Sequence, residues 1–245
     1  MNLLKSYFVW DANVRAFHWI NFACVLGLVA VGVAILNDAA LGVSNDGKIL
    51  LKTVHVWIGY VFALNLLWRL MWAFVGGTHA RWRAILPGGR GFLREIASYV
   101  ADVRVGRPRQ YLGHNPLGRM AVTLLLLLLL VQAGTGLMLA STDLFFPPFG
   151  SRIASWVAAP GVNPTTLVPY APAMYDPDAY AAMRSFREPV VSVHYYGFYV
   201  LLAFALLHIV AVVVTELREG GGLLTAMVTG RKILSVPPAD GEGAK

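Results

Sequence analysis

Four long apolar stretches constrain this chain more than any other feature of its sequence. They run from about His18 to Leu36, Thr53 to Val75, Leu117 to Ala140 and Val191 to Thr215. A helix of about 20 apolar residues spans a bilayer, and 13% of the 245 residues are charged, against about 25% in soluble domains. The sequence therefore predicts an all-α membrane protein, a bundle of four transmembrane helices that forms a single domain over residues 1–236.

The distribution of basic residues predicts how the bundle is oriented. The connection between the second and third stretches contains Arg81, Arg83, Arg90, Arg94, Arg104, Arg107 and Arg109. Because Lys and Arg gather on cytoplasmic loops, we expect this connection and both termini on the cytoplasmic side of a bacterial inner membrane. The net charge of +7 could also attract nucleic acid, but this orientation accounts for it, and we expect lipid contacts and no nucleic-acid partner.

Three segments outside the spans carry further predictions. Apolar residues at helical spacing over Gly91–Val103, and again over Leu223–Leu234, predict helices that lie along the membrane surface. The extracytoplasmic loop between the third and fourth spans, from Asp143 to Pro189, is long and rich in proline and aromatic residues, which indicates a functional or partner-covered loop. Residues 237–245 are expected to be a disordered tail.

Four histidines lie within the apolar stretches, namely His18, His55, His194 and His208. Ionisable residues inside a membrane are costly and are therefore functional candidates, although any one of them could equally be satisfied by a neighbouring helix. Fourteen residues separate His194 from His208, which places them on nearly one helix face roughly 21 Å apart. With the expected orientation, the depths pair His18 with His208 near the cytoplasm, and His55 with His194 near the outer side.

Two histidine pairs at two depths are the arrangement that two bis-histidine haems need, with the four imidazoles as axial ligands of the iron. No CxxCH occurs, so the haems are expected to be noncovalent b-type. Zinc favours about four ligands close together and fits two distant pairs poorly. The single cysteine, Cys24, can build neither an intrachain disulfide nor an iron–sulfur cluster. Glycines within the spans fit either close helix packing or room for a macrocycle.

Several motifs resemble one known family. They are VWDANVRAFHWIN at the start, HVWIGY around His55, RQYLGHNPLG before the third span, and HYYGFYVLLAFALLHIV through LLTAMVTGRK at the end. This sequence resembles the bacterial b561-like cytochromes, closest to the b-type cytochrome subunit of membrane-bound nickel–iron hydrogenases and related to formate dehydrogenase cytochrome subunits. The resemblance implies a four-helix dihaem cytochrome that links a periplasmic hydrogenase, dehydrogenase or c-type cytochrome to the quinone pool. The longer third loop departs from the family and leaves the partner open.

Further candidate residues surround the cytoplasmic pair. In the related formate dehydrogenase subunits the quinone lies near an asparagine before the third span, and Asn115 matches it; His114 and Asn115 could therefore contact a quinone, or could cap the helix that begins at Pro116. Arg69 and Arg15 could pair with haem propionates or simply extend toward the lipid headgroups. His79 is expected to be a surface residue.

These observations favour an electron-transfer subunit over a complete enzyme, with two haem b groups as cofactors and a quinone as substrate. One alternative is a stand-alone quinol-oxidising cytochrome that reduces a small oxidant such as superoxide. Another, from a different class, is a haem-free membrane anchor.

Overall fold

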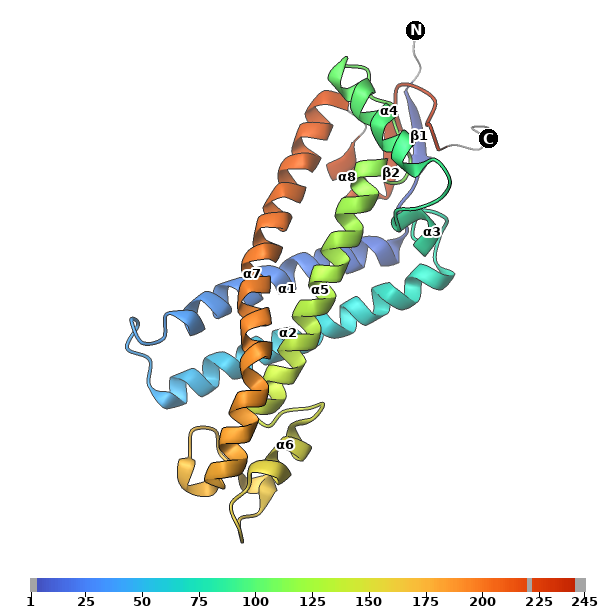
Figure 1. Ribbon diagram of the computed structural model, residues 1–245. Coiled ribbons are helices and arrows are strands. Elements are labelled where there is room, and N and C mark those ends of the chain that lie inside the picture. The colour runs from blue at the N-terminus through green and yellow to red at the C-terminus, as the bar shows by residue number, and fades with distance from the viewer. Residues whose placement is uncertain (1–3, 220–221, 241–245) are drawn as a thin grey trace. The chain divides into compact units, whose positions relative to one another are not determined.

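The computed structural model describes residues 4–219 and 222–240, and it is mostly helical (Figure 1). The elements, in chain order, are β1 (Lys5–Phe8), α1 (Ala12–Leu36), α2 (Asn45–Val75), α3 (Trp82–Ile85), α4 (Phe92–Arg104), α5 (Pro116–Asp143), α6 (Gly150–Val157), two 3-10 turns η1 (Pro164–Thr166) and η2 (Pro172–Met174), α7 (Pro177–Glu219), α8 (Leu223–Thr229) and β2 (Arg231–Leu234).

The chain divides into two compact units, and each long helix contributes to both. The termini unit comprises Met1–Trp19, Leu66–Leu128 and Leu201–Lys245. The loop unit comprises Ile20–Asn65 and Leu129–Val200. His18 and His208 therefore belong to the termini unit, whereas His55 and His194 belong to the loop unit.

Four helices of the described chain, α1, α2, α5 and α7, are long and apolar enough to cross a membrane, which confirms the four predicted spans. Many of their large apolar side chains are exposed and few are buried, as expected for surfaces that face lipid. The 43 residues of α7 extend roughly 65 Å at 1.5 Å per residue, about twice the hydrocarbon thickness of a bilayer. A large part of α7 therefore extends beyond the hydrocarbon layer.

The start of α7 differs from the prediction. We expected the span to begin near Val191, after Pro189, but the helix begins at Pro177 and continues through Pro189. Asp176 caps it, because its carboxylate accepts a hydrogen bond from the Ala179 amide at 2.8 Å, and proline suits the first helical position. The connection between α5 and α7 is consequently shorter than predicted and covers residues 144–176, which include α6, η1 and η2.

Strands β1 and β2 join the two ends of the chain in an antiparallel pair, which Figure 1 shows side by side. Lys5 lies opposite Leu234, and Phe8 lies opposite Arg231. The described ends of the chain therefore lie side by side. The surface helix predicted over Leu223–Leu234 is wrong in its second half, because the chain leaves α8 and forms β2.

Gly230 makes this change of structure possible. It ends α8 with φ 81°, a conformation that favours glycine, and its carbonyl accepts hydrogen bonds from the amides of Val9 and Trp10. A Cβ at this position would lie 2.6 Å from the Trp10 carbonyl oxygen. The backbone of β1 can thus approach the end of α8 because no side chain intervenes.

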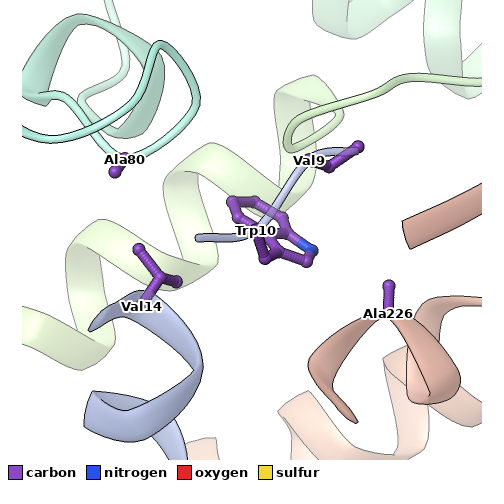
Figure 2. Close-up of a cluster of buried hydrophobic side chains, with 5 residues drawn as sticks. All are labelled: Val9, Trp10, Val14, Ala80 and Ala226. Atoms are coloured by element: carbon purple, nitrogen blue, oxygen red, sulfur yellow. The ribbon is translucent and has the colours of Figure 1, made fainter. Parts of the chain in front are cut away.

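A small apolar core holds the termini unit together. Figure 2 shows its members, which are Val9, Trp10, Val14, Ala80 and Ala226. Lys232, from β2, lies beside this core with 4% exposure. Its amine donates to the carbonyl oxygens of Tyr111 and Gly113 at 3.2 and 2.9 Å, and these bonds offset the loss of hydration of the charge. The C-terminal strand is therefore fixed to the loop that leads into α5.

The last described residues contact the same loop. The amide of Ala239 donates to the Gln110 carbonyl, and the Asp240 carboxylate accepts hydrogen bonds from the amides of Leu112 and Gly113. Ala239 and Asp240 of the predicted tail thus contact the loop before α5, and residues 241–245 lie outside the described part of the chain. The helix predicted over Gly91–Val103 is confirmed as α4, and its Leu93 is 80% exposed.

The loop unit has its own apolar core, formed by residues 144–176 (the loop cap) and the start of α7. Ile153, Val157, Tyr175 and Met183 are buried in it, and Tyr175 stacks on Tyr180 with ring centroids 4.7 Å apart. The loop cap is therefore a packed structure rather than an extended linker.

Candidate haem sites

His55 of α2 and His194 of α7 face each other in the loop unit. Their ring centroids lie 6.4 Å apart, with an angle of 77° between the ring planes. An imidazole nitrogen binds a metal at roughly 2 Å, so two rings that share one iron have centres roughly 6 Å apart. A direct edge-to-face contact falls in the same range, about 4.5–7 Å. The spacing of the two rings is therefore compatible with a shared iron atom.

Thr135 of α5 orients the His194 ring. Its hydroxyl oxygen lies 2.8 Å from Nδ1 of His194 and donates its own proton to the Val131 carbonyl at 2.7 Å. In the tautomer that matches this bond, Nδ1 of His194 donates to the Thr135 hydroxyl, and Nε2 keeps its lone pair. A metal-binding histidine needs this tautomer, with its second nitrogen bonded to an oxygen. Sequence reasoning missed Thr135, although its place one residue before Gly136 in an apolar helix was a weak signal.

Each ring of this pair also lies against a glycine of a neighbouring helix. A Cβ on Gly32 of α1 would lie 3.5 Å from Cε1 of His55, and a Cβ on Gly136 of α5 would lie 3.4 Å from Cε1 of His194. The two helices thus present bare backbone beside the imidazoles, where a flat macrocycle needs room. Gly32 and Gly136 thus fit the interpretation that span glycines leave room for a macrocycle. Gly27 fits the other interpretation, close helix packing, because it lies against Ile58.

His18 and His208 are the histidines of the termini unit. They come from α1 and α7, and their rings are close enough for their charges to interact. Nδ1 of His18 is buried without a hydrogen-bond partner among the described residues, and the same holds for Nδ1 of His55. Within the described residues, no group of three or more His, Cys, Asp or Glu side chains could hold a metal ion. Paired imidazoles suit haem, because the macrocycle supplies the other four nitrogen ligands.

Two arginines of the same unit, Arg69, which is buried, and Arg15, which is half-buried, have buried nitrogen atoms. Arg69 is 6% exposed; its Nη2 donates to the Ala80 carbonyl at 3.1 Å, while Nη1 is buried and has no partner in the described structure. Arg15 donates to the Val228 carbonyl, and its Nε is likewise buried and unpartnered within residues 4–219 and 222–240. Buried charges normally have a partner, so both side chains fit a role in binding an anion.

His114 and Asn115 lie at the start of α5. Asn115 caps the helix, because its side-chain oxygen accepts the Gly118 amide at 2.7 Å, and its amide donates to the Tyr99 hydroxyl at 2.7 Å. Burial, together with the charges of Lys232 and Arg69, lowers the pKa of His114 to about 3. His114 is therefore neutral near pH 7, and it can offer a hydrogen bond but does not store a proton.

His79 is half-buried, so the prediction of a surface residue is wrong. Its ring lies 6.4 Å from that of Trp10, which also contacts His114 at 5.0 Å. Burial lowers the pKa of His79, although the nearby Asp240 carboxylate acts in the opposite direction. The sequence could not indicate this position, because the contact joins residues near the two ends of the chain to the loop after α2.

Comparison with known proteins identifies the class to which this fold and these histidines belong. The family model described as "Prokaryotic cytochrome b561" matches residues 9–230. The chain therefore belongs to the prokaryotic cytochrome b561 family, as the motifs suggested. Membership of this family of b-type cytochromes implies haem b as the cofactor.

Similar proteins carry a more particular description. A probable Ni/Fe-hydrogenase B-type cytochrome subunit of Rhizobium leguminosarum bv. viciae is 27% identical over 239 residues, which cover 94% of this chain and 90% of that protein. A protein of the same description from Bradyrhizobium diazoefficiens is 26% identical and covers 93% and 86%. A subunit of Escherichia coli hydrogenase 1, similarly described, is 32% identical over 127 residues, 48% of this chain and 53% of its own length. No solved structure matches the chain.

Proposed function

We propose that this chain is a dihaem b-type cytochrome that carries electrons across the membrane between a periplasmic redox partner and the quinone pool. The observation that carries the proposal is the distribution of four membrane histidines as two pairs, one in each unit. His55 and His194 would hold one haem, with their rings 6.4 Å apart, and His18 and His208 would hold the other. A bis-histidine haem accepts and releases one electron and has no open position for oxygen.

The protein's side chains would fix each haem in its place. Thr135 would keep the lone pair of His194 Nε2 directed at the iron. Arg15 and Arg69, with their unpartnered buried nitrogens, would pair with the propionates of the His18–His208 haem. Such pairing removes the cost of an uncompensated buried charge.

The quinone site is proposed near His114 and Asn115, beside the His18–His208 haem. Nδ1 of His114 is buried without a hydrogen-bond partner in the described chain, so it is available to a quinone oxygen. Asn115 retains one amide proton beyond the bond to Tyr99. The arginine-rich loop after α2, placed in the cytoplasm with both termini, would provide water and protons for reduction.

A periplasmic hydrogenase is the proposed partner, and the descriptions of the relatives motivate this choice. The loop cap would form its docking surface, because it is packed into a definite shape in the unit that contains His55 and His194. Electrons passing from the partner through both haems to a cytoplasmic-side quinone site would move charge across the bilayer and store energy. Another dehydrogenase or a c-type cytochrome, docked on the loop cap, would deliver electrons along the same path.

The test of the proposal is haem content by pyridine haemochrome assay and reduced-minus-oxidised spectroscopy of the purified chain. We expect a b-type spectrum, about two haems per chain, and loss of one haem in each of His18→Ala, His55→Ala, His194→Ala and His208→Ala.

In double variants, His55→Ala/His194→Ala should retain one haem, and His55→Ala/His208→Ala should retain none. A chain without haem would support the anchor alternative, and co-purification of a hydrogenase would argue against a stand-alone quinol oxidase.

A further inference from the structure

Three charged side chains meet in the loop unit at one point. Asp143, at the end of α5, lies between Lys52 of α2 and Arg187 of α7. Its two carboxylate oxygens are each 2.6 Å from a cationic nitrogen, one from Nζ of Lys52 and one from Nε of Arg187. The three side chains are 14–22% exposed. Two cations therefore share a single carboxylate in a largely dry place, with one positive charge in excess.

The cluster lies at a defined distance from the His55–His194 pair. Lys52 precedes His55 by three residues, or roughly 4.5 Å along the helix axis, and Arg187 precedes His194 by seven residues, or roughly 10 Å. Separations of three and seven residues keep both cations near the helix faces that carry the histidines. Both cations consequently lie between the histidine pair and the loop cap, which begins directly after Asp143.

The excess charge has no second acid to balance it. Within residues 4–219 and 222–240, Asp143 is the one carboxylate within ion-pair distance of Lys52 or Arg187. Tyr170 of the loop cap covers the Lys52 ammonium, with its ring centroid 5.3 Å away, which shields the charge from water but does not neutralise it. Uncompensated charge of this kind favours an anionic ligand. Haem b carries two propionate carboxylates on one edge of its ring.

We propose that Lys52 and Arg187 bind the propionates of the haem held by His55 and His194, and that Asp143 keeps the two cations in position. This inference rests on the proposed ligation of a haem by that histidine pair. Charge-assisted hydrogen bonds to carboxylates are among the strongest in proteins, and a long lysine or arginine side chain can span the one or two helical turns to the edge of the macrocycle. The alternative is a purely structural ion-pair cluster that ties α2, α5 and α7 together.

Esterified haem separates the two interpretations. The full-length His208→Ala variant, which keeps the loop-unit pair, would be prepared without haem and titrated with haem b and with haem b dimethyl ester, whose propionates carry no charge. Binding would be followed by the Soret band. We expect haem b to bind at least about tenfold more tightly than the ester, because each lost charge-assisted bond costs roughly 1.5–3 kcal/mol, a factor of ten or more.

Adding Lys52→Met or Arg187→Met should reduce that preference several-fold, and Lys52→Arg should retain it. Lys48→Met is the matched control, since Lys48 lies one turn away on α2 and pairs with Asp38 at 3.2 Å; it should leave the preference unchanged. An equal loss of affinity for both haems in Lys52→Met and Arg187→Met, or an unchanged preference, would overturn the inference. Failure of the His208→Ala chain to bind either haem, together with a wild-type chain free of haem, would overturn the proposed function itself.

Discussion

The hydroxyl of Thr135 and Nδ1 of His194 lie 2.8 Å apart, and this contact links the imidazole of α7 to α5. The bond runs from α5 to α7 within one unit, and the carbonyl of His194 is held by the same helix through Gln132 Nε2 at 3.2 Å. Both the ring and the backbone of His194 are thus positioned by neighbouring turns of α5. A histidine held in this way would lose little side-chain freedom on binding a metal.

Thr135→Val should weaken haem binding at the His55–His194 pair and raise the midpoint potential of that haem. Loss of the bond to Nδ1 makes the imidazole a poorer electron donor, which favours ferrous iron, and removal of such a partner costs roughly 10–100-fold in metal affinity. An optical redox titration and a haem assay measure both effects. Thr123→Val, which removes a hydroxyl of α5 bonded to the Ile85 carbonyl in the termini unit, should leave this haem unchanged. Identical titrations for the two variants would contradict the assigned role.

Asn115→Asp should separate helix capping from quinone binding. Aspartate caps a helix as well as asparagine does, so the bond to the Gly118 amide is kept, while the donor to a quinone oxygen is lost. We expect normal haem spectra and slow reoxidation of both haems by quinone in stopped-flow measurements. Asn115→Ala should additionally lower helix stability by about 1 kcal/mol. Wild-type quinone kinetics in Asn115→Asp would assign Asn115 to capping alone.

Acid should destabilise the termini unit through His114. The buried ring has a pKa of about 3, whereas an unfolded histidine titrates near pH 6.5. Between these values the unfolded chain binds one more proton than the folded chain, so stability is complete above about pH 6.5 and falls as the pH decreases toward 3. Each pKa unit corresponds to about 1.4 kcal/mol, and the total loss is several kcal/mol. Urea unfolding of the detergent-solubilised chain, followed by circular dichroism, should show a shallower acid dependence in His114→Gln. An equal acid dependence of stability in the wild-type chain and in His114→Gln would mean that other groups govern it.

Gly150→Ala should unfold the loop cap without removing either haem. A Cβ at this position would lie 2.0 Å from the Phe145 carbonyl oxygen, a backbone atom that cannot move aside, and we expect a local cost of roughly 3 kcal/mol. Limited proteolysis should then cleave within residues 144–176, and electron transfer from the native partner should be lost. Gly134→Ala is the control, because nothing lies within 4 Å of a Cβ there. Normal transfer despite a cleaved cap would place the partner elsewhere.

The sequence predicted the features that depend on spacing along one helix. Apolar length predicted the four long helices, and the fourteen-residue interval separated His194 from His208, which lie in different units. It could not predict contacts between distant segments, such as Asp143 with Lys52 and Arg187, because charge alone does not reveal a partner in space. The start of α7 was misplaced because proline usually ends a helix, whereas α7 continues through Pro189.

The pairing of β1 with β2 also has a consequence for biosynthesis. The first strand leaves the ribosome early, but its partner is among the last segments to be made, and translation proceeds at roughly 5–20 residues per second. The termini unit, with Trp10 held by α8 and Lys232 fixed to the loop before α5, therefore cannot close until every span has been inserted. The loop unit ends at Val200, so its histidine pair is complete while the chain is still being synthesised. This order would let a cell load the two cofactor positions one after the other, with the His18–His208 position last.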